Sequence, residues 1–222
     1  MGQEYIRRIT VLGEVPSLGP VMLFDNMEDL FKWVEAGNMG DSVFEKIGTV
    51  AYNGSACLHM KSRTTGCASG DVIIAKRTLY ERPGKRYRFE MLWRFEAKAN
   101  CEKMTVRSKV YDGTYVHYVY LYYDAQNDKW RYTNSAGVDA DVPGGAQLLN
   151  PATFHRLQMG WDQNSQMWVK MVSDGMEIDM STLQYQRAAS ALAQRHELEI
   201  ELAVQATTPV EGYVDDVLVM EV

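Results

Sequence analysis

Hydrophobic and polar residues alternate with a period of two along most of this chain, which is typical of β-strands with one buried face. The clearest case is residues 153–180, where 155–161 and 167–172 are two predicted strands joined by a polar turn. A tight turn at 173–175 leads into a third predicted strand. Short turns between three such runs predict a meander of antiparallel strands.

The same periodicity predicts strands elsewhere in the chain. Residues 87–97 alternate as a long central strand, with Tyr87 and Trp93 on its buried face. Residues 213–222 are apolar on both faces, which is typical of a covered strand, and we expect its neighbour to be the strand predicted at 21–24. Residues 182–196 interrupt the alternation, and their alanine-rich sequence fits a short helix and a loop equally well.

The first twenty residues differ from the rest of the chain. Pro16 and Pro20 lie among small residues, and proline removes a backbone donor, so residues 1–20 are predicted to be an extended N-terminal arm or linker. The arm lies along the sandwich edge or reaches a neighbouring subunit. Residues 21–222 are predicted to form one domain, because all-β domains of this length are common.

Composition and charge exclude two classes of protein. The net charge of −6 argues against a general nucleic-acid binder, which needs a basic face. The longest apolar runs are far shorter than the ~20 residues of a membrane span. The odd number of cysteines favours free buried thiols, and the first residues lack the apolar core of a signal peptide, so we expect synthesis and folding in the cytosol.

Two stretches resemble the concanavalin A-like (laminin G-like) jelly-roll superfamily. They are FHRLQMGWDQNSQMWVKMVSDGMEIDM at 154–180 and the last strand, GYVDDVLVMEV, at 212–222. The resemblance extends over residues 24–222 and implies an all-β, antiparallel sandwich of two sheets, each with six or seven strands. It implies no particular activity, because this fold carries lectins, glycan-binding modules, hydrolases and structural domains.

Acidic residues near both ends of the predicted domain are a candidate calcium site. Asp25 and Glu28 follow the first strand, while Asp215 and Asp216 lie on the last. Calcium takes six to eight oxygen ligands, largely carboxylates and carbonyls. Consecutive strand residues face opposite ways, so one acid of the Asp-Asp pair points inward and needs a partner. A structural calcium ion is one interpretation, and a turn capped by backbone amides is the other.

Aromatic residues form the candidate glycan-binding face. Sugar rings pack on tyrosine and tryptophan, although cross-strand aromatic pairs are also ordinary stabilisers of a sheet. The residues are Tyr118, Tyr120, Tyr122, Trp130 and Tyr132.

The sequence does not predict a catalytic site. Glu177 and Asp179 match two acids of a three-carboxylate motif of glycoside hydrolases, but Thr182 stands where the third acid is required. We therefore expect a non-enzymatic jelly-roll module on the surface of a virion or another assembly. The alternative is a carbohydrate-binding module or lectin-like domain, and a glycoside hydrolase ranks below both. Expected partners are other protein subunits, including copies of this chain, or a cell-surface glycan.

Overall fold

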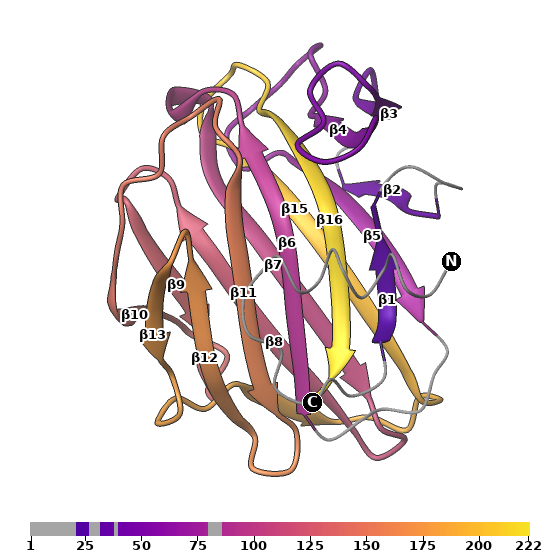
Figure 1. The fold of residues 1–222 in the computed structure, drawn as a ribbon, viewed down its shortest axis with the longest axis vertical. Helices are drawn as coiled ribbons and strands as arrows, with labels where there is room; N and C mark the ends of the chain where they lie inside the picture. The colour runs from indigo at the N-terminus through magenta and orange to yellow at the C-terminus, as the bar shows by residue number, and fades with distance from the viewer. Residues whose placement is uncertain (1–20, 27–31, 38–39, 80–85) are drawn as a thin grey trace.

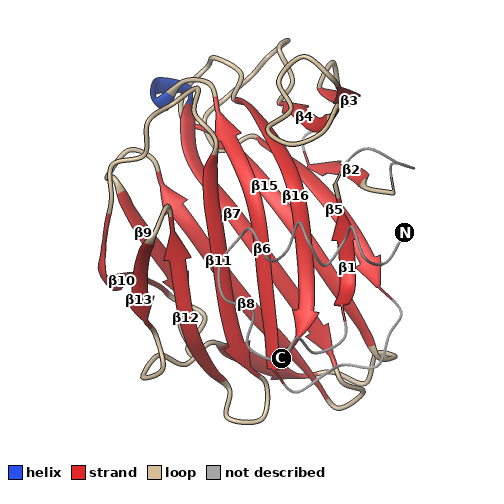
Figure 2. Cartoon of the chain, in the orientation of Figure 1, coloured by secondary structure: helices blue, strands red, loops and turns tan. Residues whose placement is uncertain are grey.

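The computed structural model describes residues 21–26, 32–37, 40–79 and 86–222, which form two antiparallel sheets (Figure 1). The predicted all-β sandwich is confirmed. In these described ranges the helical structure is one 3₁₀ turn, Lys98–Asn100 (Figure 2). The N-terminal arm predicted at 1–20 lies outside the described residues.

Sheet A has the strand order β13-β12-β11-β6-β16-β4-β3, and β1 also pairs with β16. Its strands are β1 (Val21–Asp25), β3 (Val43–Ile47), β4 (Cys57–Lys61), β6 (Arg86–Phe95), β11 (His155–Asp162), β12 (Met167–Ser173), β13 (Met176–Asp179) and β16 (Glu211–Glu221).

Sheet B has the order β10-β9-β8-β7-β15-β5-β2, and β14 also pairs with β8. Its strands are β2 (Val34–Gly37), β5 (Val72–Leu79), β7 (Cys101–Tyr111), β8 (Tyr115–Asp124), β9 (Lys129–Thr133), β10 (Asp139–Ala146), β14 (Gln186–Ala189) and β15 (Arg195–Val204). Eight strands in each sheet exceed the six or seven implied by the resemblance.

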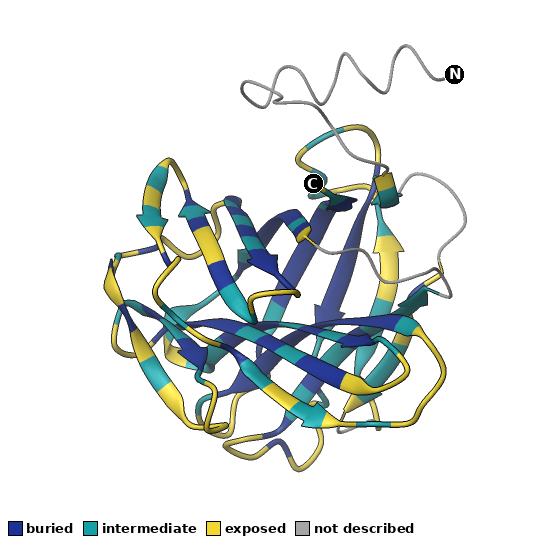
Figure 3. Cartoon of the chain, turned by 90° about the horizontal axis from the view of Figure 1, so that it is seen from below, coloured by how far each residue is buried: buried dark blue, intermediate teal, exposed yellow. Residues whose placement is uncertain are grey.

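The predicted meander is confirmed, because β11, β12 and β13 follow one another in sheet A. The predicted central strand is β6, which lies between β11 and β16. The face predicted to be buried is the buried one, since Tyr87 and Trp93 are almost completely inaccessible to solvent. The core between the sheets also contains Trp130, Trp161 and Trp168, all buried. Figure 3 shows buried segments along the strands of both sheets.

The predicted pairing of the first and last strands is also confirmed. In β1, Leu23 lies opposite Val219 and Asp25 opposite Val217. The strand β16 has a register shift against β6 after Asp215, and Asp216 has φ +45°. This irregularity is a β-bulge, which interrupts the simple alternation of faces.

The segment predicted as a helix or loop contains a short strand instead. Residues Gln186–Ala189 form β14, and Arg187 lies opposite His117 of β8. Alanine has the highest helix propensity, but tertiary contacts readily override propensity, so pairing with the part of β8 that β9 leaves uncovered decides the local structure. In the part of the chain that the structure describes, no helix has the length and apolar character needed to cross a membrane.

Candidate functional site

The side of sheet B that faces away from the core carries charged and tyrosine side chains. On β15, Leu198, Ile200 and Leu202 pack in the core, so the glutamates between them point outward. Alternation on β5, β7 and β8 completes a set that we call the charged face. Its residues are Lys76, Arg107, Lys109, Tyr118, Tyr120, Arg195, Glu197, Glu199 and Glu201.

Strand register brings these residues together from four strands. Glu199 lies opposite Lys76 on one side and Arg107 on the other. Arg107 in turn lies opposite Tyr120, whose ring centroid is 5.6 Å from the guanidinium carbon. The four side chains therefore form one row across the middle of the sheet.

Glu201 holds the arginine of this row in place. Its side chain is only 2% exposed, and both of its oxygens accept hydrogen bonds from Arg107, with Nη2–Oε1 at 3.0 Å. The hydroxyl of Thr105 lies 3.4 Å from Oε1 and donates to it. A bidentate pair of this kind fixes the orientation of the guanidinium group.

The other two glutamates are also neutralised by cations. Glu199 lies 2.8 Å from Lys109 Nζ and 3.6 Å from Lys76 Nζ. Glu197 lies 2.8 Å from Arg195 Nε and 3.3 Å from Lys76 Nζ. Burial alone would raise the pKa of Glu197, but Arg195 and Lys76 hold this pKa below its ordinary value.

The cations of the charged face stand further out than its carboxylates. The carboxylate side chains are 2–11% exposed, whereas those of the four cations are 21–36% exposed. Four cations also outnumber three glutamates. A ligand approaching this face therefore meets positive groups and tyrosine rings before it meets the acids.

This arrangement does not favour acid–base hydrolysis by two carboxyl groups. A glycosidase of that kind needs one carboxyl group with a raised pKa. Glu197 has a lowered pKa, and Glu199 and Glu201 are ion-paired. Glu177 and Asp179, considered from the sequence, lie on the exposed hairpin strand β13 of sheet A.

The aromatic residues predicted as one glycan-binding face are divided between two sides of sheet B. The rings of Tyr118 and Tyr120, both on the charged face, meet edge to face at 5.8 Å. Trp130 and Tyr132, in contrast, pack in the core. The reason is register: Tyr122 lies opposite Arg131, so the neighbours of Arg131 on β9 point inward. The predicted five-residue face is therefore wrong as a single surface.

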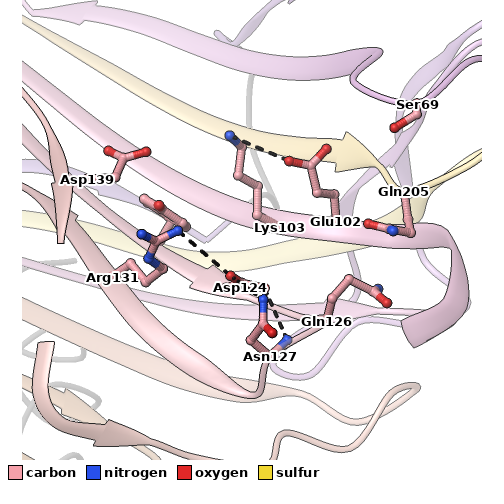
Figure 4. Close-up of a pocket in the computed structure, with 10 residues that line it drawn as sticks. Ser69, Glu102, Lys103, Asp124, Gln126, Asn127, Arg131, Asp139 and Gln205 are labelled. Carbon is pink, nitrogen blue, oxygen red and sulfur yellow. Dashed lines mark hydrogen bonds and ion pairs between the residues drawn. The ribbon is translucent and has the colours of Figure 1, made fainter. Parts of the chain in front are cut away.

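A cavity of about 490 Å³ opens beside the first residues of β7 and the last residues of β8, next to the charged face (Figure 4). Tyr122 lies in the wall of this cavity, two residues from Tyr120 on the same strand. We call the cavity the Tyr122 pocket. Its lining residues are Ser69, Glu102, Lys103, Tyr122, Asp124, Gln126, Asn127, Arg131, Asp139 and Gln205.

The predicted calcium ligands are only partly brought together. Asp25 forms an ion pair with Arg77 of sheet B, and Glu28 lies outside the described residues. Asp216 accepts a hydrogen bond from the side chain of Asn53. Among the described residues, no three histidine, cysteine or acidic side chains are grouped as metal ligands would be.

Asp215 is fully buried on the side of sheet A away from the core, opposite Leu92. One of its oxygens accepts from the backbone N–H groups of Tyr52 (3.0 Å) and Asn53 (3.1 Å). Burial raises the pKa of Asp215 to about 7, against the lowering effect of these amides. The sequence predicted that one acid of the Asp-Asp pair points into the core; Asp215 is instead buried on the outer side of the sheet, where a loop backbone supplies its partners.

The sequence interpretation missed the cations of the charged face. Two signals were present: the alternating acids of Glu197-Leu198-Glu199-Ile200-Glu201, and the basic residues Arg107 and Lys109, two apart in a stretch where Met104, Val106 and Val110 recur with the same period. Without the register between β7 and β15, nothing indicated that these acids and bases meet.

No protein-family model and no curated protein matches the sequence. Solved structures do match. The endo-β-1,4-glucuronan lyase of Trichoderma reesei has a TM-score of 0.63 and 10% identity, with 91% of this chain and 96% of that one covered. The cellulose-induced protein Cip1 has a TM-score of 0.60, 13% identity, and coverage of 90% and 97%.

A variant of the alginate lyase Aly36B, bound to an alginate trisaccharide, is also similar. Its TM-score is 0.54 at 11% identity, with 91% of this chain and 99% of that one covered. The expectation of a non-enzymatic module is therefore corrected, because the structures that share this fold over nearly the whole chain include enzymes. The two eight-stranded sheets and these likenesses together show that the chain has the concanavalin A-like jelly-roll fold.

Proposed function

We propose that this protein binds an acidic polysaccharide on the charged face and cleaves it as a polysaccharide lyase. One observation carries the proposal: on the charged face the cations are more exposed than the carboxylates that neutralise them. A chain of uronic acid units offers carboxylates to these cations, and arginine is well suited to bind a carboxylate through two hydrogen bonds. Two of the similar structures described above, a glucuronan lyase and an alginate lyase, are named for acidic polysaccharides and support the same class of substrate.

The row across the sheet contains the groups that an elimination needs. Arg107 and Lys109 would pair with the uronate carboxylate and so acidify the C5–H bond beside it. Glu199 would remove the C5 proton as general base. The C5–H electron pair would form the C4=C5 double bond as the C4–O bond breaks. Tyr120 would then give its proton to the leaving oxygen.

The positions of the two proposed proton-transfer groups agree with this scheme. Glu199 and Tyr120 lie on either side of Arg107, about 10 Å apart across two strand spacings. A sugar ring can therefore lie over Arg107 between them. Burial raises the pKa of Tyr120, although Arg107 opposes this, so the hydroxyl keeps its proton until it donates.

The reaction is tested by incubating the protein with glucuronan, alginate and polygalacturonate. Cleavage by elimination leaves an unsaturated uronate, which is followed by its ultraviolet absorbance. We expect product from at least one polymer and a loss of about 10²-fold or more in rate for Glu199→Gln, as for removal of a general base. Glu177→Gln, on the exposed hairpin, is the matched control and should keep the rate.

Binding is tested separately with a matched pair of double variants. Arg107→Gln with Glu201→Gln removes an ion pair from the charged face, while Arg156→Gln with Glu90→Gln removes one from the outer side of sheet A. Affinity electrophoresis in gels containing the acidic polymer should show weaker retardation for the first double variant only. Equal retardation of both would contradict the proposed site, and preference for a neutral glucan would contradict the substrate class.

The predicted surface role on a virion or another assembly remains a prediction that neither the described residues nor the compared structures support. An acidic glycan that binds without releasing an unsaturated product would favour the predicted carbohydrate-binding alternative over the lyase.

A further inference from the structure

The Tyr122 pocket differs from the neighbouring charged face in the sign of its charge. The charged face has four cations against three carboxylates. In the pocket the carboxylates outnumber the cations, since Glu102, Asp124 and Asp139 are set against Lys103 and Arg131. Two adjoining parts of one surface are therefore suited to sugar units of different charge.

Several walls of the pocket are held by hydrogen bonds to the protein itself. The amide of Gln126 donates to the backbone oxygens of Lys98 (2.8 Å) and Cys101 (2.7 Å). Asp124 accepts from the side-chain amide of Asn127 at 3.0 and 2.9 Å. A site whose walls are already ordered loses little conformational entropy when a ligand binds.

The ring of Tyr122 lies between the two cations of the pocket. Lys103 Nζ is 5.5 Å and the guanidinium carbon of Arg131 is 5.6 Å from the ring centroid. Arg131 also lies 4.0 Å from Asp124, and Lys103 lies 3.9 Å from Glu102 (Figure 4). Each cation of the pocket thus lies beside a carboxylate.

The presence of both signs of charge in the pocket disfavours a charged sugar of either sign. A uronate in the pocket would approach Glu102, Asp124 and Asp139, and like charges repel. An amino sugar with a free ammonium group would approach Lys103 and Arg131 beside the tyrosine ring. A neutral sugar avoids both repulsions, and its hydroxyl groups can donate to the carboxylates in charge-assisted hydrogen bonds.

We propose that the Tyr122 pocket binds a neutral, hydroxyl-rich sugar unit next to a uronate held at Arg107, so that the preferred polysaccharide contains both neutral and acidic units. The inference rests on the proposed function, because it takes the charged face as the uronate site. Tyr120 and Tyr122 lie two residues apart on β8, about 7 Å along the strand, so the two sites adjoin. Burial and the Asp139 carboxylate, with which the hydroxyl forms a hydrogen bond, raise the pKa of Tyr122.

The test compares mixed and purely acidic oligosaccharides of equal length. Hyaluronan and unsulfated chondroitin oligosaccharides alternate glucuronate with an uncharged N-acetylated sugar, whereas oligoglucuronate and oligoalginate carry a carboxylate on every unit. Titration calorimetry with Glu199→Gln protein, which should not cleave its ligand, gives the affinities. We expect at least one mixed oligosaccharide to bind about tenfold or more tightly than either purely acidic one.

Two double variants then test whether the pocket causes this preference. Glu102→Gln with Asp139→Asn removes two of the three carboxylates, so it should tighten binding of the acidic oligosaccharides and reduce the preference below about threefold. Glu177→Gln with Asp179→Asn makes the same change on the hairpin of sheet A and should leave the preference intact.

The outcomes separate the two proposals. Equal affinity for mixed and acidic oligosaccharides, or a preference unaffected by the pocket variant, overturns the inference and leaves the acidic-glycan site standing. Failure of every acidic and mixed oligosaccharide to bind overturns both.

Discussion

Each sheet has a buried acid on its outer side, but the groups that cover the two acids differ. On sheet A, Asp215 is fully buried, and backbone N–H groups of Tyr52 and Asn53 cover it. On sheet B, Glu201 is almost as deeply buried, but the side chain of Arg107 covers it. A loop thus closes one surface, whereas side chains from neighbouring strands leave the other open.

The difference affects charge as well as access. Amide groups only partly replace water around a carboxylate, so burial raises the pKa of Asp215 to about 7. A guanidinium group carries a full positive charge and neutralises Glu201 directly. The open side can therefore present charge to a ligand, while the closed side fixes a loop to the sheet.

The largest expected effect is a loss of stability on replacing an arginine, compared between the outer sides of sheets B and A. Arg107→Ala should lower the free energy of unfolding by about 3–5 kcal/mol, because it leaves the buried Glu201 without its charged partner. Arg156→Ala should cost less, since Glu90 keeps its ion pair with Arg88. Urea unfolding of both variants measures the difference. Equal losses would show that the two sides do not differ in this respect.

The next effect concerns pH and the closed side. Asp215 has a folded-state pKa near 7, above its ordinary value of 3.8, so the folded protein holds this proton more tightly than the unfolded chain does. Its contribution to stability is full below about pH 4 and is lost as the pH rises through about 7. Over this range the change is a few kcal/mol.

Urea unfolding in EDTA at several pH values, with wild type and Asp215→Asn, measures this contribution. The variant should lose the Asp215 part of the pH dependence. Asp41→Asn, at an acid that is held by Thr64 and Thr65 and has a lowered pKa, is the control. A pH dependence unchanged by Asp215→Asn would mean that this carboxyl group titrates normally.

The smallest expected effect concerns the predicted calcium site beside Asp215. A bound ion at a hundredfold excess over its dissociation constant would stabilise the fold by about 2.7 kcal/mol. EDTA should then lower the melting temperature of calcium-loaded protein, and Asp216→Asn should remove this sensitivity. A melting curve that EDTA leaves unchanged would assign Asp215 and Asp216 to the loop alone.

Much of the sandwich could be predicted from the sequence, because alternation reports directly which residues of a strand are buried. The meander β11-β12-β13 and the pairing of β1 with β16 followed from such patterns. What alternation lacks is the register between strands. Trp130 and Tyr132 were therefore assigned to the same side as Tyr122, although the turn after Asp124 sets Tyr122 opposite Arg131.

The candidate site was harder to predict for the same reason. Glu197, Glu199 and Glu201 were interpretable as one solvated side of a strand, but three of their four cations come from β5 and β7, more than 80 residues away in sequence. The amides that cover Asp215 also come from a distant loop without strand periodicity. Contacts of this kind depend on topology, which the local pattern does not encode.

The positions of β15 and β16 have a consequence for how the chain is made. β16 lies between β6 and β4 in sheet A, and β15 lies between β7 and β5 in sheet B (Figure 1). Until both strands have left the ribosome, sheet B consists of two separate parts, and sheet A consists of β13-β12-β11-β6, β4-β3 and the single strand β1, with unpaired edges facing an empty position. Such edges pair readily with other chains. The nascent protein is therefore most exposed to aggregation just before residues 195–221 emerge, and a chaperone that shields strand edges would be most effective at that stage.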